Sequence, residues 1–161
     1  MEMPAAGPDD ETLLLDLLNT TPVVDGVPTD LLEPQWLTER HIEPSELTGL
    51  GAARDVLQAV VRGERSPAAL QPFLDAVTLQ PVISDAGIDW QFTAADAAAR
   101  TVIAWDTLRI SSPGRLRPCA NDECHLFLLD RSKPNTARWC SMAICGNRMK
   151  ARRHYRRSRA D

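Results

Sequence analysis

Cysteine is the residue type in this sequence whose spacing most directly indicates chemistry. All four cysteines fall within 27 consecutive positions with the spacing C-x4-C-x15-C-x4-C, at Cys119, Cys124, Cys140 and Cys145. Two close pairs joined by a short segment suit a tetrahedral zinc site, because each pair can wrap the ion from a tight loop. Four thiolates leave no open coordination position, so we expect one structural zinc ion and not a catalytic one. The alternative is a set of four ordinary buried thiols.

The histidines do not form an enzyme-like pattern. His41, His125 and His154 are scattered, and the chain has neither an H-E-x-x-H motif nor a glycine-rich phosphate loop. A zinc ion closed by four thiolates cannot activate water. We therefore expect no enzyme and no catalytic residues, and we expect His125 to lie beside the metal site without ligating the ion.

The segment after the last cysteine is strongly basic. On a helix its cations cover a wide arc. Asn147, Ala151 and Tyr155 share a narrow strip, which we expect to pack on a hairpin between the two cysteine pairs. Such dense charge favours a polyanionic partner, through counterion release, over the alternative of a solvated tail. The excess of arginine over lysine favours bidentate contacts to phosphate or guanine. We expect DNA, with RNA as a variant, to bind Arg138, Arg148, Lys150, Arg152, Arg153, Arg156, Arg157 and Arg159.

Charge divides the chain of 161 residues into two modules. Residues 1–114 hold six arginines and no lysine against 18 acidic residues, a net charge of −12. Residues 115–161 hold 12 basic residues against four acidic ones, a net charge of +8, and contain every cysteine. We place the boundary in a linker at 111–114. The opposite charges suggest that the acidic module shields the basic one in the same chain.

The acidic module is predicted to be mostly helical, from apolar spacing and helix-start signals. A small β-hairpin over 81–84 and 88–92, closed by Asp85-Ala86-Gly87, interrupts it, and a polar loop surrounds Asp25-Gly26. Helices are expected from Asp9 or Asp10 to Leu18, over Trp36 and Leu37 from Pro34, from Pro44 to Gly63, from Ser66-Pro67 to Val77, and from a Thr93–Asp96 capping box to Leu108 or Arg109.

Between the cysteine pairs, the sequence predicts a strand at 126–129 that turns at 130–135 and returns over 137–139, with a helix after the second pair. This is the layout of a treble-clef-like zinc finger. The expected fold class is α+β, mostly α.

Nothing in the chain suggests a membrane. No apolar run exceeds four residues, far short of the roughly 18 needed to span a bilayer. The start Met1-Glu2-Met3-Pro4 lacks the basic and apolar regions of a secretory signal, so we expect a cytoplasmic protein. Thiols stay reduced there, which argues against disulfides.

The stretch from Trp139 to Arg148 carries a family resemblance. Residues 117–157, with Cys-Gly-Asn-Arg at their centre, resemble the CGNR zinc finger, and Leu15-Asp16-Leu17-Leu18-Asn19-Thr20 resembles the opening of the ABATE domain that accompanies it in stress-induced transcription regulators. The resemblance implies that the four cysteines are the zinc ligands and that the finger is a DNA-binding part of a bacterial regulator. The N-terminal domain would then sense a signal or mediate assembly.

Several roles follow as hypotheses. Gly146 would let the backbone bend close to the metal, Asn147 would bond a carbonyl of a cysteine loop or cap the helix, and Arg148 would pair with Asp122 or Glu123 or face a phosphate. Asn19 and Thr20 would mark a ligand pocket, or merely satisfy backbone groups at a helix end.

A homodimer is expected if DNA is read as half-sites, and the sequence identifies no small-molecule effector. The rival function is a protein-interaction adaptor whose basic helix binds an acidic partner.

Overall fold

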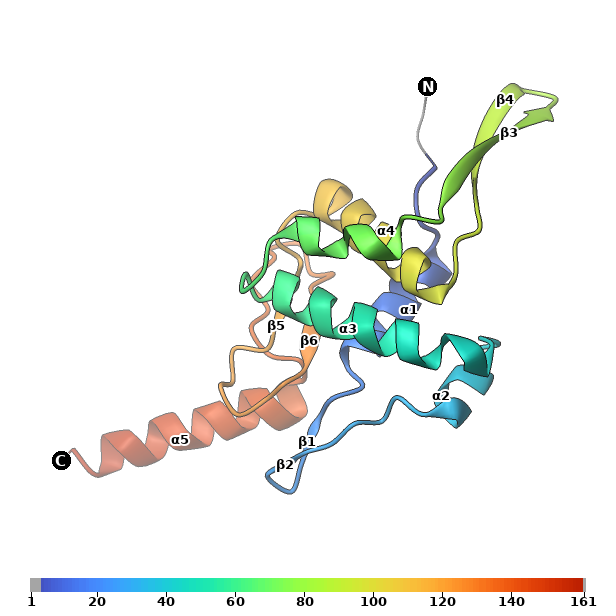
Figure 1. Ribbon diagram of the computed structural model, residues 1–161. Helices are drawn as coiled ribbons and strands as arrows, with labels where there is room; N and C mark the ends of the chain where they lie inside the picture. The colour runs from blue at the N-terminus through green and yellow to red at the C-terminus, as the bar shows by residue number, and fades with distance from the viewer. Residues whose placement is uncertain (1–3, 161) are drawn as a thin grey trace.

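The computed structural model describes residues 4–160 of the chain (Figure 1). Residues 1–3, which the signal-peptide expectation used, lie outside the described residues. Over these described residues the structure combines helices with three small two-stranded sheets and places a four-cysteine cluster near the C-terminus, as expected for the coarse fold class. No described helix has the length and apolar character required to cross a membrane.

Helices α1 (Pro8–Leu18), α3 (Leu47–Val61) and α4 (Ala97–Ser111) enclose the hydrophobic core, with α2 (Pro34–Thr38) at one end. The leucine stripe predicted for α1 is confirmed, because Leu13, Leu14, Leu17 and Leu18 are all buried. Leu50 and Leu57 of α3 and Val102 of α4 pack into the same core. Burial of these apolar side chains is the main favourable contribution to folding of this part.

Two helix ends differ from expectation. The Ser66 hydroxyl accepts from the Ala68 amide as predicted, but the helix that follows is a 3-10 helix, η2 (Pro67–Phe73), and it stops well before Val77. Pro72 inside it lacks an amide hydrogen, which limits helical hydrogen bonding. For α4, the Asp96 carboxylate accepts from Ala99 at 2.8 Å and is itself the N-cap, so the predicted Thr93–Asp96 capping box is wrong.

The helix predicted from Pro44 is present as a short 3-10 turn, η1 (Pro44–Glu46), that continues into α3. The polar loop around Asp25-Gly26 instead contains a short ladder of β1 (Val23–Val24) with β2 (Val27–Pro28). Asp25 and Gly26 have φ angles of 50° and 78°. Positive φ at both turn positions is the hallmark of the tight hairpin turn that Asp-Gly favours, which is the signal that the sequence interpretation overlooked.

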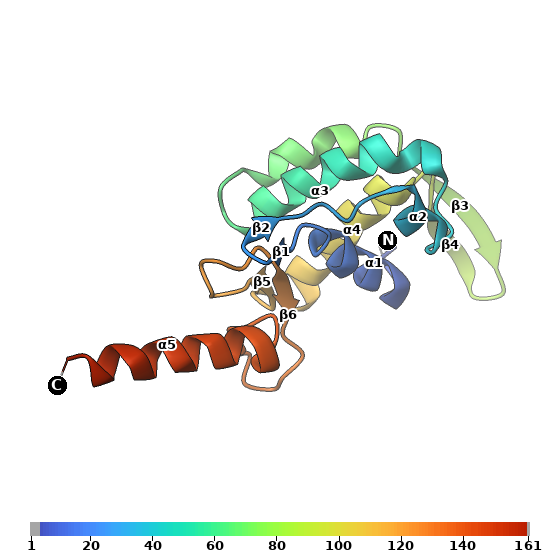
Figure 2. The same ribbon diagram turned by 90° about the horizontal axis from the view of Figure 1, so that it is seen from below.

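The predicted central hairpin is confirmed and is longer than expected. Strands β3 (Thr78–Ser84) and β4 (Gly87–Thr93) pair antiparallel from Thr78↔Thr93 to Ser84↔Gly87. In both ribbon views this hairpin projects from the helices on the opposite side of the molecule from the C-terminal helix (Figures 1 and 2).

The C-terminal part contains β5 (Leu116–Pro118), β6 (Phe127–Leu129), η3 (Met142–Gly146) and helix α5 (Asn147–Ser158). The predicted strand near 126–129 exists, but its partner is β5 and not residues 137–139. The first cysteine loop connects β5 to β6, so the nearest segment in sequence forms the ladder. Residues 137–139 run beside the start of that loop, where the Ala120 amide donates to the Arg138 carbonyl at 2.8 Å.

Candidate metal centre and basic helix

The four cysteine sulfurs converge on one point. All four Sγ atoms lie within 4.8 Å of one another, and the Cys124–Cys140 and Cys140–Cys145 Sγ distances are both 3.6 Å. A tetrahedral zinc ion with Zn–S bonds of about 2.3 Å needs its sulfurs about 3.8 Å apart. Disulfides need sulfurs about 2.05 Å apart, so these thiols are not paired covalently. The geometry therefore fits one four-coordinate zinc ion.

Each cysteine is held by a different local element. Cys119 follows β5 directly, Cys124 lies in the turn before β6, Cys140 lies in the loop that returns to the site, and Cys145 lies within the π-helical turn η3. The Cys119 amide donates to the Leu126 carbonyl at 2.9 Å, which closes the first loop. The first pair is thus fixed by the β5–β6 ladder and the second pair by the root of α5.

Three N–H groups donate to the cysteine sulfurs. The Leu126 amide donates to Cys124 Sγ at 3.5 Å, and the Cys140 amide donates to Cys119 Sγ at 3.4 Å. The third donor is the side chain of Asn121, which is 1% exposed and reaches Cys145 Sγ at 3.5 Å. Such bonds disperse the negative charge of a four-thiolate site and orient its ligands. The sequence interpretation missed Asn121, whose signal was a polar residue inside a cysteine loop.

Burial and hydrogen bonds shift the pKa values of three of these thiols in different directions. Burial raises the pKa of Cys124 to about 11 and also raises the pKa of Cys140. For Cys145, burial likewise raises the pKa, but hydrogen bonds from Asn121 and the other cysteines outweigh it and lower the pKa overall. Without an ion the Cys124 and Cys140 thiols therefore hold their protons, and zinc binding must displace them.

Arg117 and Asp130 organise the loop that carries the chain back to the cluster. Asp130 is buried and accepts from the Ser132 amide, the Ala137 amide and Arg117 Nη2, each within 2.8 Å. Hydrogen bonds from the Ser132 side chain and backbone and from the Ala137 amide, together with the positive charge of Arg117, outweigh burial and lower the pKa of Asp130 to about 2. Arg117 also donates to the Ala137 carbonyl at 2.6 Å. The turn predicted over 130–135 does not indicate this buried carboxylate, for which the Asp-x-Ser pattern is the available signal.

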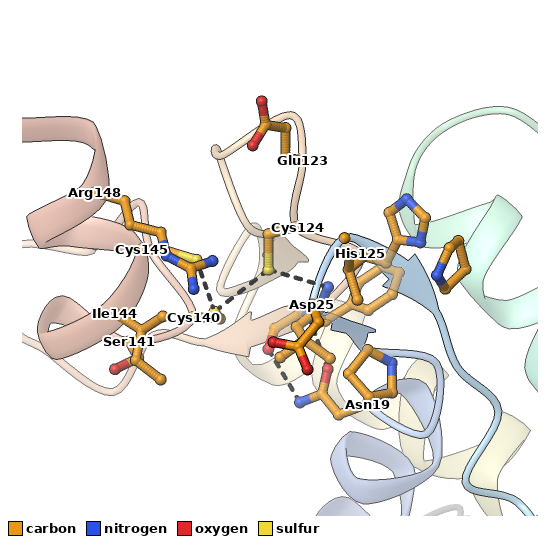
Figure 3. Close-up of a pocket in the computed structure, with 16 residues that line it drawn as sticks. Asn19, Asp25, Glu123, Cys124, His125, Cys140, Ser141, Ile144, Cys145 and Arg148 are labelled. Atoms are coloured by element: carbon orange, nitrogen blue, oxygen red, sulfur yellow. Dashed lines mark hydrogen bonds between the residues drawn. The ribbon is translucent and has the colours of Figure 1, made fainter. Parts of the chain in front are cut away.

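A cleft of about 710 Å³ lies between the β1–β2 turn and the cysteine loops (Figure 3). His125 lines this cleft, and the clustered ligand atoms are those of the four cysteines. Arg148 also faces it, and no carboxylate of residues 4–160 lies within 4 Å of the Arg148 guanidinium. Glu123 instead forms an ion pair with Arg152, so the pairing suggested for Arg148 with Glu123 is wrong.

Asn19 and Thr20 have intramolecular partners. Asn19 lines the cleft and joins α1 to the finger, because its side chain accepts from the Phe127 amide at 2.7 Å and donates to the Phe127 carbonyl at 3.2 Å. Thr20 is 2% exposed, donates to the Leu17 carbonyl and accepts from Arg54. These bonds satisfy helix-end and strand backbone groups, and the ligand role of both residues stays a prediction.

The finger packs against the helices through Phe127. This ring is 2% exposed and belongs to the main hydrophobic core, and the Arg62 guanidinium lies 4.7 Å from its centroid. The two charge modules therefore share one core.

Helix α5 extends away from the body (Figures 1 and 2) and has no buried residue. Ala151 and Tyr155 are exposed, so the strip expected to pack on the finger hairpin does not do so. Arg152 joins α5 to the first cysteine loop through Glu123, and Arg159 stacks on Tyr155. No α5 cation pairs with a carboxylate of residues 4–114, although Arg131 of the basic module lies 3.6 Å from the Glu11 carboxylate of α1. Shielding of the basic module by the acidic one stays a prediction.

Gly146 and Asn147 fix the junction of η3 with α5. Gly146 has φ and ψ of −59° and −47°, an ordinary helical conformation, so the expected backbone bend is wrong. The position is tightly packed, because a Cβ there would lie 3.0 Å from Met142 Sδ and 3.2 Å from Trp139 Cδ1, so a larger residue requires these side chains to shift. Asn147 Nδ2 donates to the Ala143 carbonyl at 3.2 Å, inside the second cysteine loop, as predicted.

A comparison with protein families agrees with this geometry. The model of the CGNR zinc finger matches residues 115–158, which include every cysteine and the whole of α5. No curated protein matches the chain. The clustered sulfurs within this zinc-finger segment form the site of one structural zinc ion.

Proposed function

We propose that this protein is a DNA-binding transcription regulator in which the zinc finger presents α5 to the double helix. The observation that carries the proposal is the state of α5: all of its residues remain accessible, and Arg152 is its one cation paired with a described carboxylate. Because its other cations have no such ion pair among the described residues, they can contact phosphates without first breaking one, and Arg152 alone would have to exchange Glu123 for a phosphate.

The distribution of cations suits a groove with phosphates on both sides. The 12-residue helix is about 18 Å long. Its diameter, about 10–12 Å with side chains, matches the width of the DNA major groove, which is about 12 Å. Arg148, Arg152 and Arg156 follow one side at a spacing of four residues. Lys150, Arg153 and Arg157 follow a second side, about 140° around the helix axis. Each side can reach one phosphate backbone, and Arg138, which stacks at 5.1 Å on the Trp139 ring, extends the surface near the root of the helix.

Zinc gives this surface its orientation. Cys145 lies in the turn that leads into α5, and Arg152 connects the helix to the loop that holds Cys124. We infer a treble-clef-like arrangement, in which one ligand pair comes from the β5–β6 loop and the other from the start of the helix. Metal loss would release the root of α5 from the cysteine loop between β5 and β6.

The helical part would regulate the finger. We propose that it is an ABATE-type domain of a stress-responsive regulator, and that it senses a signal or mediates assembly. RNA is a variant of the same electrostatic mechanism. An adaptor function, with an acidic protein bound to α5, is the rival.

A fluorescence-anisotropy titration of labelled duplex DNA at several salt concentrations tests the proposal. We expect the intact protein to show a steep salt dependence and Cys140→Ser to bind much more weakly. Arg153→Gln removes one phosphate contact and should reduce the slope of log K against log salt by about 0.9. Arg65→Gln, at an exposed arginine of the acidic module, is the matched control and should leave the slope unchanged.

Equal binding by the intact protein and Cys140→Ser would remove the finger from the mechanism. Effective competition by single-stranded RNA would favour the RNA variant. Weakly salt-dependent binding to a protein, without binding to DNA, would favour the adaptor.

A further inference from the structure

The β3–β4 hairpin has one polar and one apolar face. Side chains alternate along each strand, and residues opposite each other in the ladder share a face. The pairs Ser84↔Gly87, Val82↔Asp89, Gln80↔Gln91 and Thr78↔Thr93 form the mainly polar face. The pairs Leu79↔Phe92, Pro81↔Trp90 and Ile83↔Ile88 form a wholly apolar face.

The apolar face is covered only near the base of the hairpin. Leu79, Trp90 and Phe92 are half-buried, whereas Ile83 is 78% exposed and Ile88 is 60% exposed. An isolated two-stranded hairpin is marginally stable in water unless its apolar face packs against something. The described chain supplies that packing at the base and leaves the tip uncovered.

An apolar groove of about 670 Å³ lies at the foot of the same hairpin, between η2 and α4. Leu74, Val102 and Trp105 line it, and Ile110, which is 66% exposed, lies on its wall. Phe92 belongs both to the groove and to the apolar face of the hairpin. The two apolar surfaces are therefore continuous.

We propose that two copies of this chain form a two-fold symmetric dimer in which each hairpin tip enters the groove of the other copy. Each strand has seven residues and is about 24 Å long. When two such hairpins lie antiparallel with their apolar faces together, the tip of each reaches the base of the other, where the groove begins. The contact is isologous, so the Ile83–Ile88 tip and the groove are each used twice.

The area of the hairpin explains why the groove must take part. A face about 24 Å long and about 10 Å wide offers about 240 Å² per copy. Two such faces fall short of the roughly 1,000 Å² expected of a specific interface. Seating both tips in the grooves adds the missing apolar contact.

The chemistry of the hairpin favours a second copy over other occupants. The hairpin carries Asp85 and Asp89 and has no lysine or arginine between residues 78 and 93, which disfavours a nucleic acid. Pro81 has no amide hydrogen, so strand addition along the full outer edge of β3 is disfavoured. A projecting apolar tip and an apolar groove on one chain complement each other when two copies meet.

Sedimentation equilibrium of the full-length, zinc-loaded protein without DNA tests this inference independently of the proposed DNA binding. We expect a monomer–dimer equilibrium. The double variant Ile83→Glu/Ile88→Glu should raise the dimer dissociation constant about 10,000-fold, because the symmetric interface contains four of these isoleucines and each accounts for about tenfold. Ile110→Glu on the groove wall occurs twice in the dimer and should weaken association about 100-fold.

Gln80→Glu/Gln91→Glu is the matched control. It also places two glutamates opposite each other in the hairpin, but on the polar face, so any loss of hairpin stability is shared by both double variants. Dimerisation retained in the control and lost in the tip variant supports the proposal. A wild-type protein that stays monomeric, or a dimer that survives either the tip or the groove variant, overturns it.

Discussion

Replacing Asn19 with alanine tests the connection between the helices and the finger. The Asn19 side chain accepts from the Phe127 amide at 2.7 Å and donates to the Phe127 carbonyl at 3.2 Å, across 108 positions of sequence. Alanine removes both bonds and leaves two partly buried backbone groups of β6 without these partners. No cysteine ligand is touched.

The expected loss is about 2 kcal/mol of unfolding free energy, because each hydrogen bond contributes about 1 kcal/mol net. For a protein of this size that corresponds to a fall of about 4–8 °C in Tm. Circular dichroism of the zinc-loaded protein during heating measures the shift. Metal analysis of the folded variant should still give one zinc per chain, since the cysteine cluster is intact.

Gln91→Ala is the control. Gln91 is an exposed amide on the polar face of the β3–β4 hairpin, and its removal should change stability by less than about 0.5 kcal/mol. An Asn19→Ala protein whose Tm falls no further than that of the control would refute the assigned connection between α1 and β6. A normal Tm combined with loss of zinc would refute it as well.

Three further outcomes are expected. Cys145→Ser should abolish stoichiometric zinc binding, measured by elemental analysis, while Ser66→Ala, which removes only a helix cap, should leave it intact. Asp130→Asn should lower stability at neutral pH. Because the pKa of Asp130 is lowered to about 2, the difference from wild type in urea unfolding should be full above about pH 5 and shrink as the pH falls from about 4 to 2. A pH-independent difference would contradict the stabilising role assigned to the ionised carboxylate. Gly146→Val should reduce thermal stability, since its Cβ would meet Met142 and Trp139 at 3.0–3.2 Å; unchanged stability would show that these side chains move freely.

Features with local sequence signals were predictable. The cysteine spacing indicates the metal site, because the two ligands of each pair lie within a few residues of each other and are recognisable in a short stretch of sequence. The leucine stripe of α1 and the apolar alternation of β3 and β4 likewise depend on short-range periodicity.

Features that depend on distant contacts were not predictable. The sequence contains a strand near Phe127, but whether it pairs with β5 or with 137–139 depends on tertiary packing. Asparagine is a common residue type at helix ends, so Asn19 looks ordinary in the sequence. Nothing near it in sequence indicates a hydrogen bond to residue 127. Asp130 was assigned to a turn, although its carboxylate also fixes Arg117 across the loop. Propensities describe neighbours along the chain and leave such pairings open.

Phe127 is part of the helical core and lies three residues after a zinc ligand, so metal occupancy and core stability are thermodynamically linked. A molecule that binds only the folded state stabilises it in proportion to the logarithm of its free concentration, and zinc acts in this way on the finger. Coupling between two binding equilibria is reciprocal. An effector that tightened the packing of α1 and α3 around Phe127 would therefore also raise the affinity for zinc, and zinc starvation would weaken the binding of that effector.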